Sequence, residues 1–151
     1  MSVSLRAATY AGTAPLRLAP SVAKCVRVYD GDTVWLAYEH GDLIIRSSAR
    51  LVGVDTPEVR TRNAVEKAAG LAARDELREL ILGKLVRVRV PEGATDKYGR
   101  LLVRLWEDTG DYLFDDDTSI NTRIMNRWGV PYCGGKKAEV DWSVVPRGGG
   151  L

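Results

Sequence analysis

The residues of this chain that could do chemistry are concentrated in three short segments. One of them, residues 50–58, reads Arg-Leu-Val-Gly-Val-Asp-Thr-Pro-Glu. Its valines favour a strand, and Pro57 ends that strand because proline cannot continue a ladder. The strand would begin at Arg50 and bring the carboxylates of Asp55 and Glu58 to its end, which is a common way to build a site on a rigid element. A plain strand followed by an acidic turn is the alternative interpretation.

A second segment, residues 30–33, reads Asp-Gly-Asp-Thr. Asp32 and Asp55 are expected at the ends of neighbouring strands, where two carboxylates repel unless a cation lies between them. With backbone carbonyls and water they would form an all-oxygen site suited to calcium. A zinc site of the His/Cys type is not expected, because the chain has one histidine, His40, and two widely separated cysteines. Ordinary turn chemistry, which favours Asp and Gly, is the alternative for residues 30–33.

The third segment, residues 95–100, reads Thr-Asp-Lys-Tyr-Gly-Arg. The guanidinium groups of Arg50 and Arg100 could each hold a phosphate through a planar fork of N–H groups. In-line attack on phosphorus builds charge on the equatorial oxygens, which fixed arginines and a cation stabilise. A carboxylate near a metal-bound water, such as Glu58, could act as a general base. The alternatives are surface charges for the arginines and a solvated residue for Glu58.

Together the three segments resemble the thermonuclease family, the staphylococcal-nuclease-like domains. The similarity rests on the DGDT turn, the RLxxVDTPE strand end and the TDKYGR turn, in the family's order, over about residues 24 to 132. The resemblance implies one calcium ion held by Asp32, Asp55 and the carbonyl of Thr56, with Asp30 in the surrounding shell. It also implies that Arg50, Glu58 and Arg100 are catalytic, Glu58 by positioning or deprotonating the attacking water.

The resemblance extends to the substrate. Lys97 and Tyr98 match residues that contact a nucleotide phosphate, and Tyr132 lies roughly where the family has a tyrosine that stacks on a base, although the local match is poor. The implied activity is calcium-dependent hydrolysis of DNA and RNA, with single-stranded or frayed substrate preferred and 3′-phosphate ends left. A non-catalytic OB-type module that binds nucleic acid or protein is the alternative. Inactive domains of the family usually lack several of the five charged positions, and this chain has all five.

Alternating apolar residues predict five strands, at residues 22–29, 33–38, 43–54, 84–90 and 101–106. A helix is expected over residues 64–82, with Asn63 and Glu66 as a capping box and Gly83 as its stop. A second helix is expected from Thr118 to about Trp128, with residues 115–117, three aspartates, at the positive end of its dipole. This order describes an α+β, mainly β fold: a five-stranded OB-fold Greek-key barrel with two or three flanking helices.

The chain has 151 residues and a net charge of +2. We expect one domain at residues 22–142, a loosely ordered lead-in at 1–21 and a flexible glycine-rich tail at 143–151, with the family's third helix missing or truncated. The weak positive charge is compatible with a nucleic-acid substrate but does not argue for one by itself. The absence of a long apolar run and of a convincing signal peptide predicts a cytoplasmic protein that spans no membrane. We also expect a monomer, and free thiols at Cys25 and Cys133, with one bridge between them as the alternative.

Overall fold

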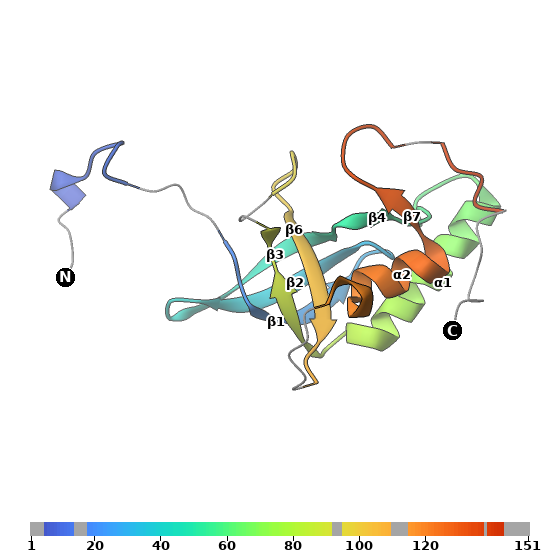
Figure 1. The fold of residues 1–151 in the computed structure, drawn as a ribbon, viewed down its shortest axis with the longest axis horizontal. Helices are drawn as coiled ribbons and strands as arrows, with labels where there is room; N and C mark the ends of the chain where they lie inside the picture. Colours follow the sequence, from blue (N-terminus) through green and yellow to red (C-terminus); the bar gives the residue numbers. More distant parts are fainter. Residues whose placement is uncertain (1–4, 14–17, 92–94, 110–114, 138, 144–151) are drawn as a thin grey trace.

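The computed structural model describes residues 5–13, 18–91, 95–109, 115–137 and 139–143. Five strands close into a barrel in the order β1-β2-β3-β6-β5, and two helices pack beside it (Figure 1). The strands are β1 (Val22–Val28), β2 (Thr33–His40), β3 (Leu43–Leu51), β5 (Leu85–Arg89) and β6 (Leu101–Glu107). Neighbours pair antiparallel except β3 and β6, which are parallel. The expected five-stranded barrel, with a helix between its third and fourth strands, is confirmed.

The barrel core comes from the alternation of apolar residues along these strands. On β2, for example, Val34 and Leu36 are fully buried, whereas Trp35 and Ala37, which alternate with them, are half-buried. Inward residues of the other strands meet them: Ala23, Cys25, Val28, Ala49, Leu51, Val86, Val88, Leu101, Val103 and Leu105. Cys25 is buried and Cys133 is exposed, and both are free thiols.

Helix α1 (Ala64–Ile81) closes the barrel through Leu77 and Ile81. The side chain of Asn63 accepts a hydrogen bond from the Glu66 N–H, and Gly83 follows with a φ of 78°, as expected for the cap and the stop. The second half of the capping box is not formed. The Glu66 carboxylate instead accepts a hydrogen bond from the N–H of Glu58, at 3.2 Å, so this residue supports the segment that carries the predicted site.

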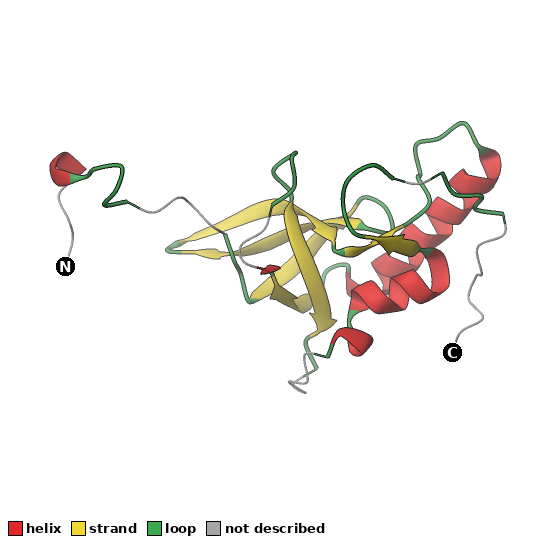
Figure 2. Cartoon of the chain, turned by 45° about the horizontal axis from the view of Figure 1, so that its top comes forward, coloured by secondary structure: helices red, strands yellow, loops and turns green. Residues whose placement is uncertain are grey.

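The long strand expected at residues 43–54 is interrupted. β3 ends at Leu51, and Gly53 has a φ of 83°, a conformation that β-carbons disfavour. Gly53 is also the first residue of β4 (Gly53–Asp55). This short strand leaves the barrel and pairs antiparallel with β7 (Val130–Tyr132). The strand β7 is not among the five strands expected from the sequence. Figure 2 shows this two-stranded ribbon beside the helices at one end of the barrel.

Helix α2 (Ile120–Trp128) begins two residues later than expected. Ser119 is its N-cap, because its hydroxyl accepts a hydrogen bond from the Thr122 N–H. The preceding aspartates form a short 3-10 turn, Asp116–Thr118, which Asp115 caps. In the first turn of α2, the buried Asn121 donates to the carbonyls of Val52 and Val103 and accepts from the N–H of Leu105. This amide ties the helix to the point where the β3–β4 strand breaks.

Other expectations fall partly outside the described residues. The structure describes residues 5–13 and 18–21 of the expected lead-in, where Leu5–Ala7 form a short 3-10 helix. Residues 144–151, which include most of the expected tail and the place of a third helix, are not described. The division into lead-in, domain and tail stays a prediction. No helix within the described ranges is long and apolar enough to cross a membrane.

Candidate active site

Three charged side chains form the buried centre of the site. Arg50 at the end of β3 lies between two carboxylates, with its Nη1 2.9 Å from Asp32 Oδ1 and its Nη2 3.6 Å from Asp55 Oδ1. All three residues are at most 6% exposed. Its Nη2 also donates to the carbonyl of Val54, at 3.1 Å. The structure thus brings Asp32 and Asp55 near one another, as expected, but the cation between them here is a guanidinium of the chain itself.

The turn at residues 30–33 is held together by its own carboxylates. Asp32 accepts hydrogen bonds from the Thr33 hydroxyl at 3.0 Å and from both the N–H and the hydroxyl of Thr56, each at 3.1 Å. Asp30 accepts from the N–H of Asp32 at 3.0 Å. Burial, with a smaller contribution from the charge of Asp32, raises the pKa of Asp30 to about 8. The segment therefore makes the turn contacts typical of Asp and still presents Asp32 to Arg50.

Two glycines allow the site segments to lie against each other and against α1. A β-carbon on Gly31 would lie 2.9 Å from Thr56 Oγ1. On Gly70, which is buried in α1, it would lie 2.8 Å from the carbonyl oxygen of Pro57 and 2.7 Å from that of Glu58. Both approaches are closer than a β-carbon tolerates, so the path of residues 56–58 depends on these two positions.

Glu58 lies further out, where its carboxylate is half-exposed. The ammonium of Lys137 contacts it at 3.1 Å and contacts Asp55 Oδ1 at 2.8 Å. Asp55 Oδ1 is nevertheless buried without a hydrogen bond of good geometry. Burial lowers the pKa of Lys137, but its contacts with Asp55 and Glu58 outweigh burial, and the net shift is upward. Lys137 thus connects the two carboxylates at the outer side of the site.

Arg100 joins the network from the other side. Its Nε donates to Asp96 Oδ2 at 2.6 Å, and its Nη1 donates to the Thr33 hydroxyl at 3.5 Å. Burial raises the pKa of Asp96, but hydrogen bonds from Arg100 and from the N–H of Tyr98 outweigh it and lower that pKa. Because Thr33 in turn donates to Asp32, hydrogen bonds and ion pairs connect all five charged residues predicted from the sequence.

Two cavities meet at this network. The acidic cavity, with a volume of about 370 Å³, is lined by Asp55, Thr56, Glu58, Glu66, Lys137, Glu139, Val140 and Trp142. The basic cavity, of about 360 Å³, is lined by Arg50, Asp96, Lys97, Tyr98, Arg100, Leu102, Tyr132, Gly134 and Gly135. Arg50 lines the basic cavity and Asp55 lines the acidic one, and their side chains approach to 3.6 Å. One side of the site thus suits a cation and the other suits a phosphate.

The aromatic residues predicted to bind substrate belong to the basic cavity. The Arg50 Cζ lies 4.9 Å from the centre of the Tyr132 ring, on β7. Tyr98 is 71% exposed, with Lys97 Nζ at 5.1 Å and Arg100 Cζ at 5.5 Å from its ring centre. Tyr132, whose sequence match was poor, therefore lies beside the arginine of the site because β7 pairs with β4.

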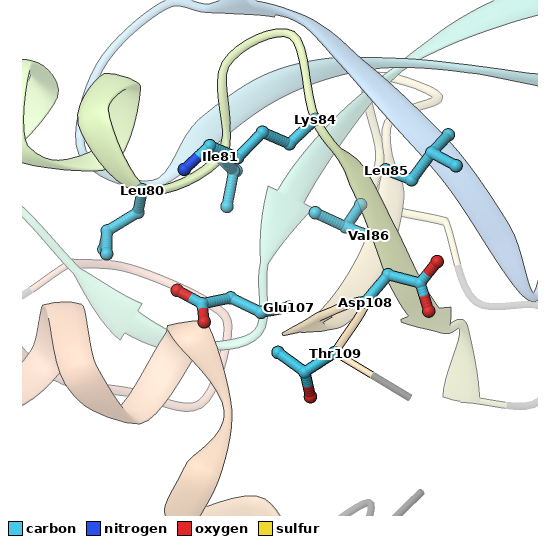
Figure 3. A pocket seen from close by; sticks show the side chains of 8 residues that line it. All are labelled: Leu80, Ile81, Lys84, Leu85, Val86, Glu107, Asp108 and Thr109. Carbon is cyan, nitrogen blue, oxygen red and sulfur yellow. The ribbon is translucent and has the colours of Figure 1, made fainter. Parts of the chain in front are cut away.

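The described His, Cys, Asp and Glu side chains do not gather into a group of three or more that could hold a metal ion. A cation at this site would need backbone carbonyls and water in addition to carboxylates. A further cavity of about 480 Å³ (Figure 3) contains none of the predicted site residues and lies between the end of α1 and the β5–β6 pair. It is lined by Leu80, Ile81, Lys84, Leu85, Val86, Glu107, Asp108 and Thr109.

Sequence reasoning missed two side chains of the site, Lys137 and the supporting carboxylate of Glu66. Glu66 was interpreted as a helix cap, and its spacing of eight residues from Glu58 carries no signal of a contact. Lys137 is 79 residues from Glu58 and follows two glycines. Its neighbour Lys136 offers the same charge, so the sequence contains no signal that would single out Lys137.

Comparison with known proteins agrees with the family that the motifs indicated. A family model described as "Staphylococcal nuclease homologue" matches residues 48–129, more than half of the chain. A thermonuclease of Staphylococcus intermedius is 35% identical over 89 residues, which is 59% of this chain and 49% of the relative. A thermonuclease of Staphylococcus hyicus is 32% identical over 83 residues, 55% of this chain and 47% of the relative. The Yarrowia lipolytica protein named "Probable endonuclease LCL3" is 36% identical over 93 residues, 60% of this chain and 38% of the relative.

The chain thus spans about half the length of the staphylococcal relatives it matches and less of the yeast one. The matched region of the family model, residues 48–129, contains Arg50, Asp55, Glu58 and Arg100 and the whole of both helices. With the closed five-stranded barrel and a family model that covers more than half of its residues, the chain belongs to the staphylococcal nuclease homologue family.

Proposed function

We propose that this protein is a calcium-dependent nuclease that hydrolyses phosphodiester bonds in DNA and RNA. The observation that carries the proposal is the connected network from Arg100 to Glu58, which lies where an acidic and a basic cavity meet. Metal-assisted phosphodiester hydrolysis uses both environments, a cation to offset the charge of the phosphate and cationic side chains to hold it. The relatives named thermonuclease and probable endonuclease support the same class of reaction.

The oxygen atoms near the acidic cavity fit a hard divalent cation. Asp55 Oδ1 is buried without a hydrogen bond of good geometry, so its negative charge needs a cation beside it, and in the metal-free protein Lys137 and Arg50 supply that charge. We assign Asp32, Asp55 and the carbonyl of Thr56 as the groups that would hold calcium. Asp30 supports Asp32 because its carboxylate accepts a hydrogen bond from the backbone N–H of Asp32. A bound calcium ion would supply positive charge to the phosphate and lower the pKa of a bound water.

Arg50 and Arg100 bind the phosphate in this proposal. Asp32 and the carbonyl of Val54 orient the guanidinium of Arg50, so its position is set before substrate arrives. The Nε of Arg100 donates to Asp96 and its Nη1 donates to the Thr33 hydroxyl, which leaves its Nη2 to donate toward the basic cavity. Donors that are already oriented stabilise the charge that develops on the phosphate oxygens without paying for reorganisation.

Glu58 accepts the proton of the attacking water. Its backbone N–H donates a hydrogen bond to the Glu66 carboxylate, and its carbonyl oxygen lies close to Gly70. Its half-exposed carboxylate can pass the proton to solvent. The water oxygen forms the new bond to phosphorus as the bond to the 5′ oxygen breaks, and the departing 5′ oxygen takes a proton from solvent. The products are a 3′-phosphate end and a 5′-hydroxyl end.

The rest of the substrate would lie in the basic cavity. Lys97 and Tyr98 lie where they can contact a neighbouring phosphate, and the ring of Tyr132 offers a face for a base. A base can stack on a side chain only when it is not stacked in a duplex. We therefore expect single-stranded or frayed substrate to be preferred over intact duplex.

The test is cleavage of labelled single- and double-stranded DNA and RNA in calcium, magnesium or chelator, with analysis of the product ends. We expect cleavage with calcium and none with chelator. Glu58→Gln should lower kcat by about 10²- to 10⁴-fold, and Arg100→Ala by about 10²- to 10³-fold. Matched controls are Glu79→Gln on the exposed face of α1 and Arg87→Ala on β5, away from both cavities.

Two outcomes would contradict the proposal. Wild-type activity in the Glu58→Gln, Arg100→Ala double variant would show that these two residues are not the catalytic groups. Tight binding of single-stranded DNA in calcium without turnover would favour the alternative function, a non-catalytic module that binds nucleic acid. The complete network of five charged residues argues for the enzyme, because a binding module has no need of Glu58 beside a buried carboxylate.

A further inference from the structure

The acidic cavity contains a cation that belongs to the chain. Four carboxylates line this cavity, from Asp55, Glu58, Glu66 and Glu139, and Lys137 is the one basic side chain among the described residues that line it. Its ammonium lies 2.8 Å from Asp55 Oδ1 and 3.1 Å from Glu58 Oε1. Its side chain is 40% exposed, whereas that of Asp55 is 7% exposed. The lysine side chain thus stays partly exposed while its ammonium contacts the buried carboxylate of Asp55.

The fold directs Lys137 to this place. β7 pairs with β4 so that Val130 lies opposite Asp55 and Tyr132 opposite Gly53. The chain then turns through Gly134 and Gly135, whose φ values are 94° and 80°. The Tyr132 hydroxyl donates to the carbonyl of Gly135 at 2.6 Å and closes the turn. Two residues later the backbone has returned to the acidic cavity.

We propose that Lys137 is a tethered counter-ion of Asp55 and Glu58 that competes with the divalent cation for Asp55. The inference rests on the proposed function, because it concerns the cation that the nuclease would use. Asp55 Oδ1 is the buried oxygen that lacks a good hydrogen bond, and it is also the atom nearest to the ammonium. An ammonium and a divalent cation cannot both occupy the space beside that oxygen. The four-carbon stem of lysine lets the ammonium leave toward solvent while the backbone stays in place.

Two consequences follow for the metal-free and the loaded protein. Without a cation, Lys137 offsets the repulsion between Asp55 and Glu58 and keeps both carboxylates at the site. When a divalent cation binds, the contact of the Lys137 ammonium with Asp55 is lost. The loss of this contact makes the net free energy of cation binding less favourable. Lys137 therefore weakens cation binding and, at the same time, stabilises the metal-free fold.

The test uses Lys137→Met, which keeps most of the stem and removes the charge. An exposed ion pair contributes little, but one of the two carboxylates here is buried. We therefore expect calcium to bind about three- to tenfold more tightly by isothermal titration calorimetry. In chelator, the melting temperature should fall by about 2–4 °C, and saturating calcium should reverse most of that loss. Lys137→Arg keeps the charge and should return both values toward those of the wild type.

Lys136→Met is the matched control. It removes the same charge one residue away, and Lys136 is exposed and makes no ion pair with another described residue. We expect its calcium affinity and its melting temperature in chelator to stay near those of the wild type. An equal shift in Lys136→Met would overturn the inference, because the effect would then come from net charge and not from the contact.

Weaker calcium binding by Lys137→Met would also overturn it, as would an unchanged affinity together with an unchanged melting temperature in chelator. These readouts separate the inference from the proposed function. If the wild type cleaves no nucleic acid with any cation, the proposed function fails, while the melting temperatures in chelator still decide whether Lys137 acts as a counter-ion. If the wild type cleaves and Lys137→Met matches it in both readouts, the inference alone fails.

Discussion

Replacement of Gly70 by alanine separates the effect of local helix propensity from that of the tertiary site. Gly70 lies in the interior of α1, where glycine costs about 0.5–1 kcal/mol relative to alanine. Helix propensity alone therefore predicts that Gly70→Ala stabilises the protein. The structure predicts the opposite, because the new methyl group would meet the carbonyl oxygens of Pro57 and Glu58 at 2.8 and 2.7 Å.

The size of the effect follows from these distances. Carbon and carbonyl oxygen rarely approach closer than about 3.3 Å, so residues 57–58 must move by at least half an ångström. Forcing an extra methyl group into a packed position costs about 1–3 kcal/mol, which exceeds the gain in propensity. We expect a net loss of about 1–2 kcal/mol, seen as a fall in melting temperature of about 3–6 °C. Because displacing a catalytic group by about 1 Å can cost 100-fold, kcat should fall by about 10- to 100-fold.

The assays are thermal unfolding in chelator and cleavage of single-stranded DNA at saturating calcium. The control is Ala68→Gly, at an exposed position of the same helix, which should lose about 1 kcal/mol of stability and keep the wild-type kcat. A Gly70→Ala protein that melts higher than the wild type and cleaves at a similar rate would refute the reasoning. It would show that the path of residues 57–58 does not depend on their contact with α1.

Two further predictions concern buried polar groups. Asn121→Ala removes three hydrogen bonds between α2 and the strands, and the unsatisfied backbone groups should cost about 2–4 kcal/mol in urea unfolding; a loss below about 1 kcal/mol would contradict this account. The folded-state pKa of Asp30, about 8, lies above its ordinary value of 3.8, so between these values the folded protein binds more protons than the unfolded chain. The stability of the metal-free protein should therefore fall as pH rises through this range, by at most about 1.4 kcal/mol per pH unit. Asp30→Asn should show a shallower slope in urea unfolding at pH 5 to 8 in chelator, and equal slopes in both proteins would count against the assignment.

Much of the fold could be predicted from local pattern. The alternation on β2 and the cap at Asn63 act over a few residues, so the sequence records them directly. The break at Gly53 was missed because residues 43–54 keep a strand-like composition through it. The start of α2 was missed because Thr118 and Ser119 are both good capping residues, and the choice between them depends on the packing of Asn121 against the barrel.

The sequence by itself determined which charged residues are available for chemistry, namely Asp32, Arg50, Asp55, Glu58 and Arg100, and in which order the strands present them. The tertiary structure decided which of them touch. It placed Arg50 between the two aspartates and brought Lys137 to the outer carboxylates. The reason is that ion pairs depend on distances between segments far apart in the chain, and strand pairing, such as that of β4 with β7, sets those distances.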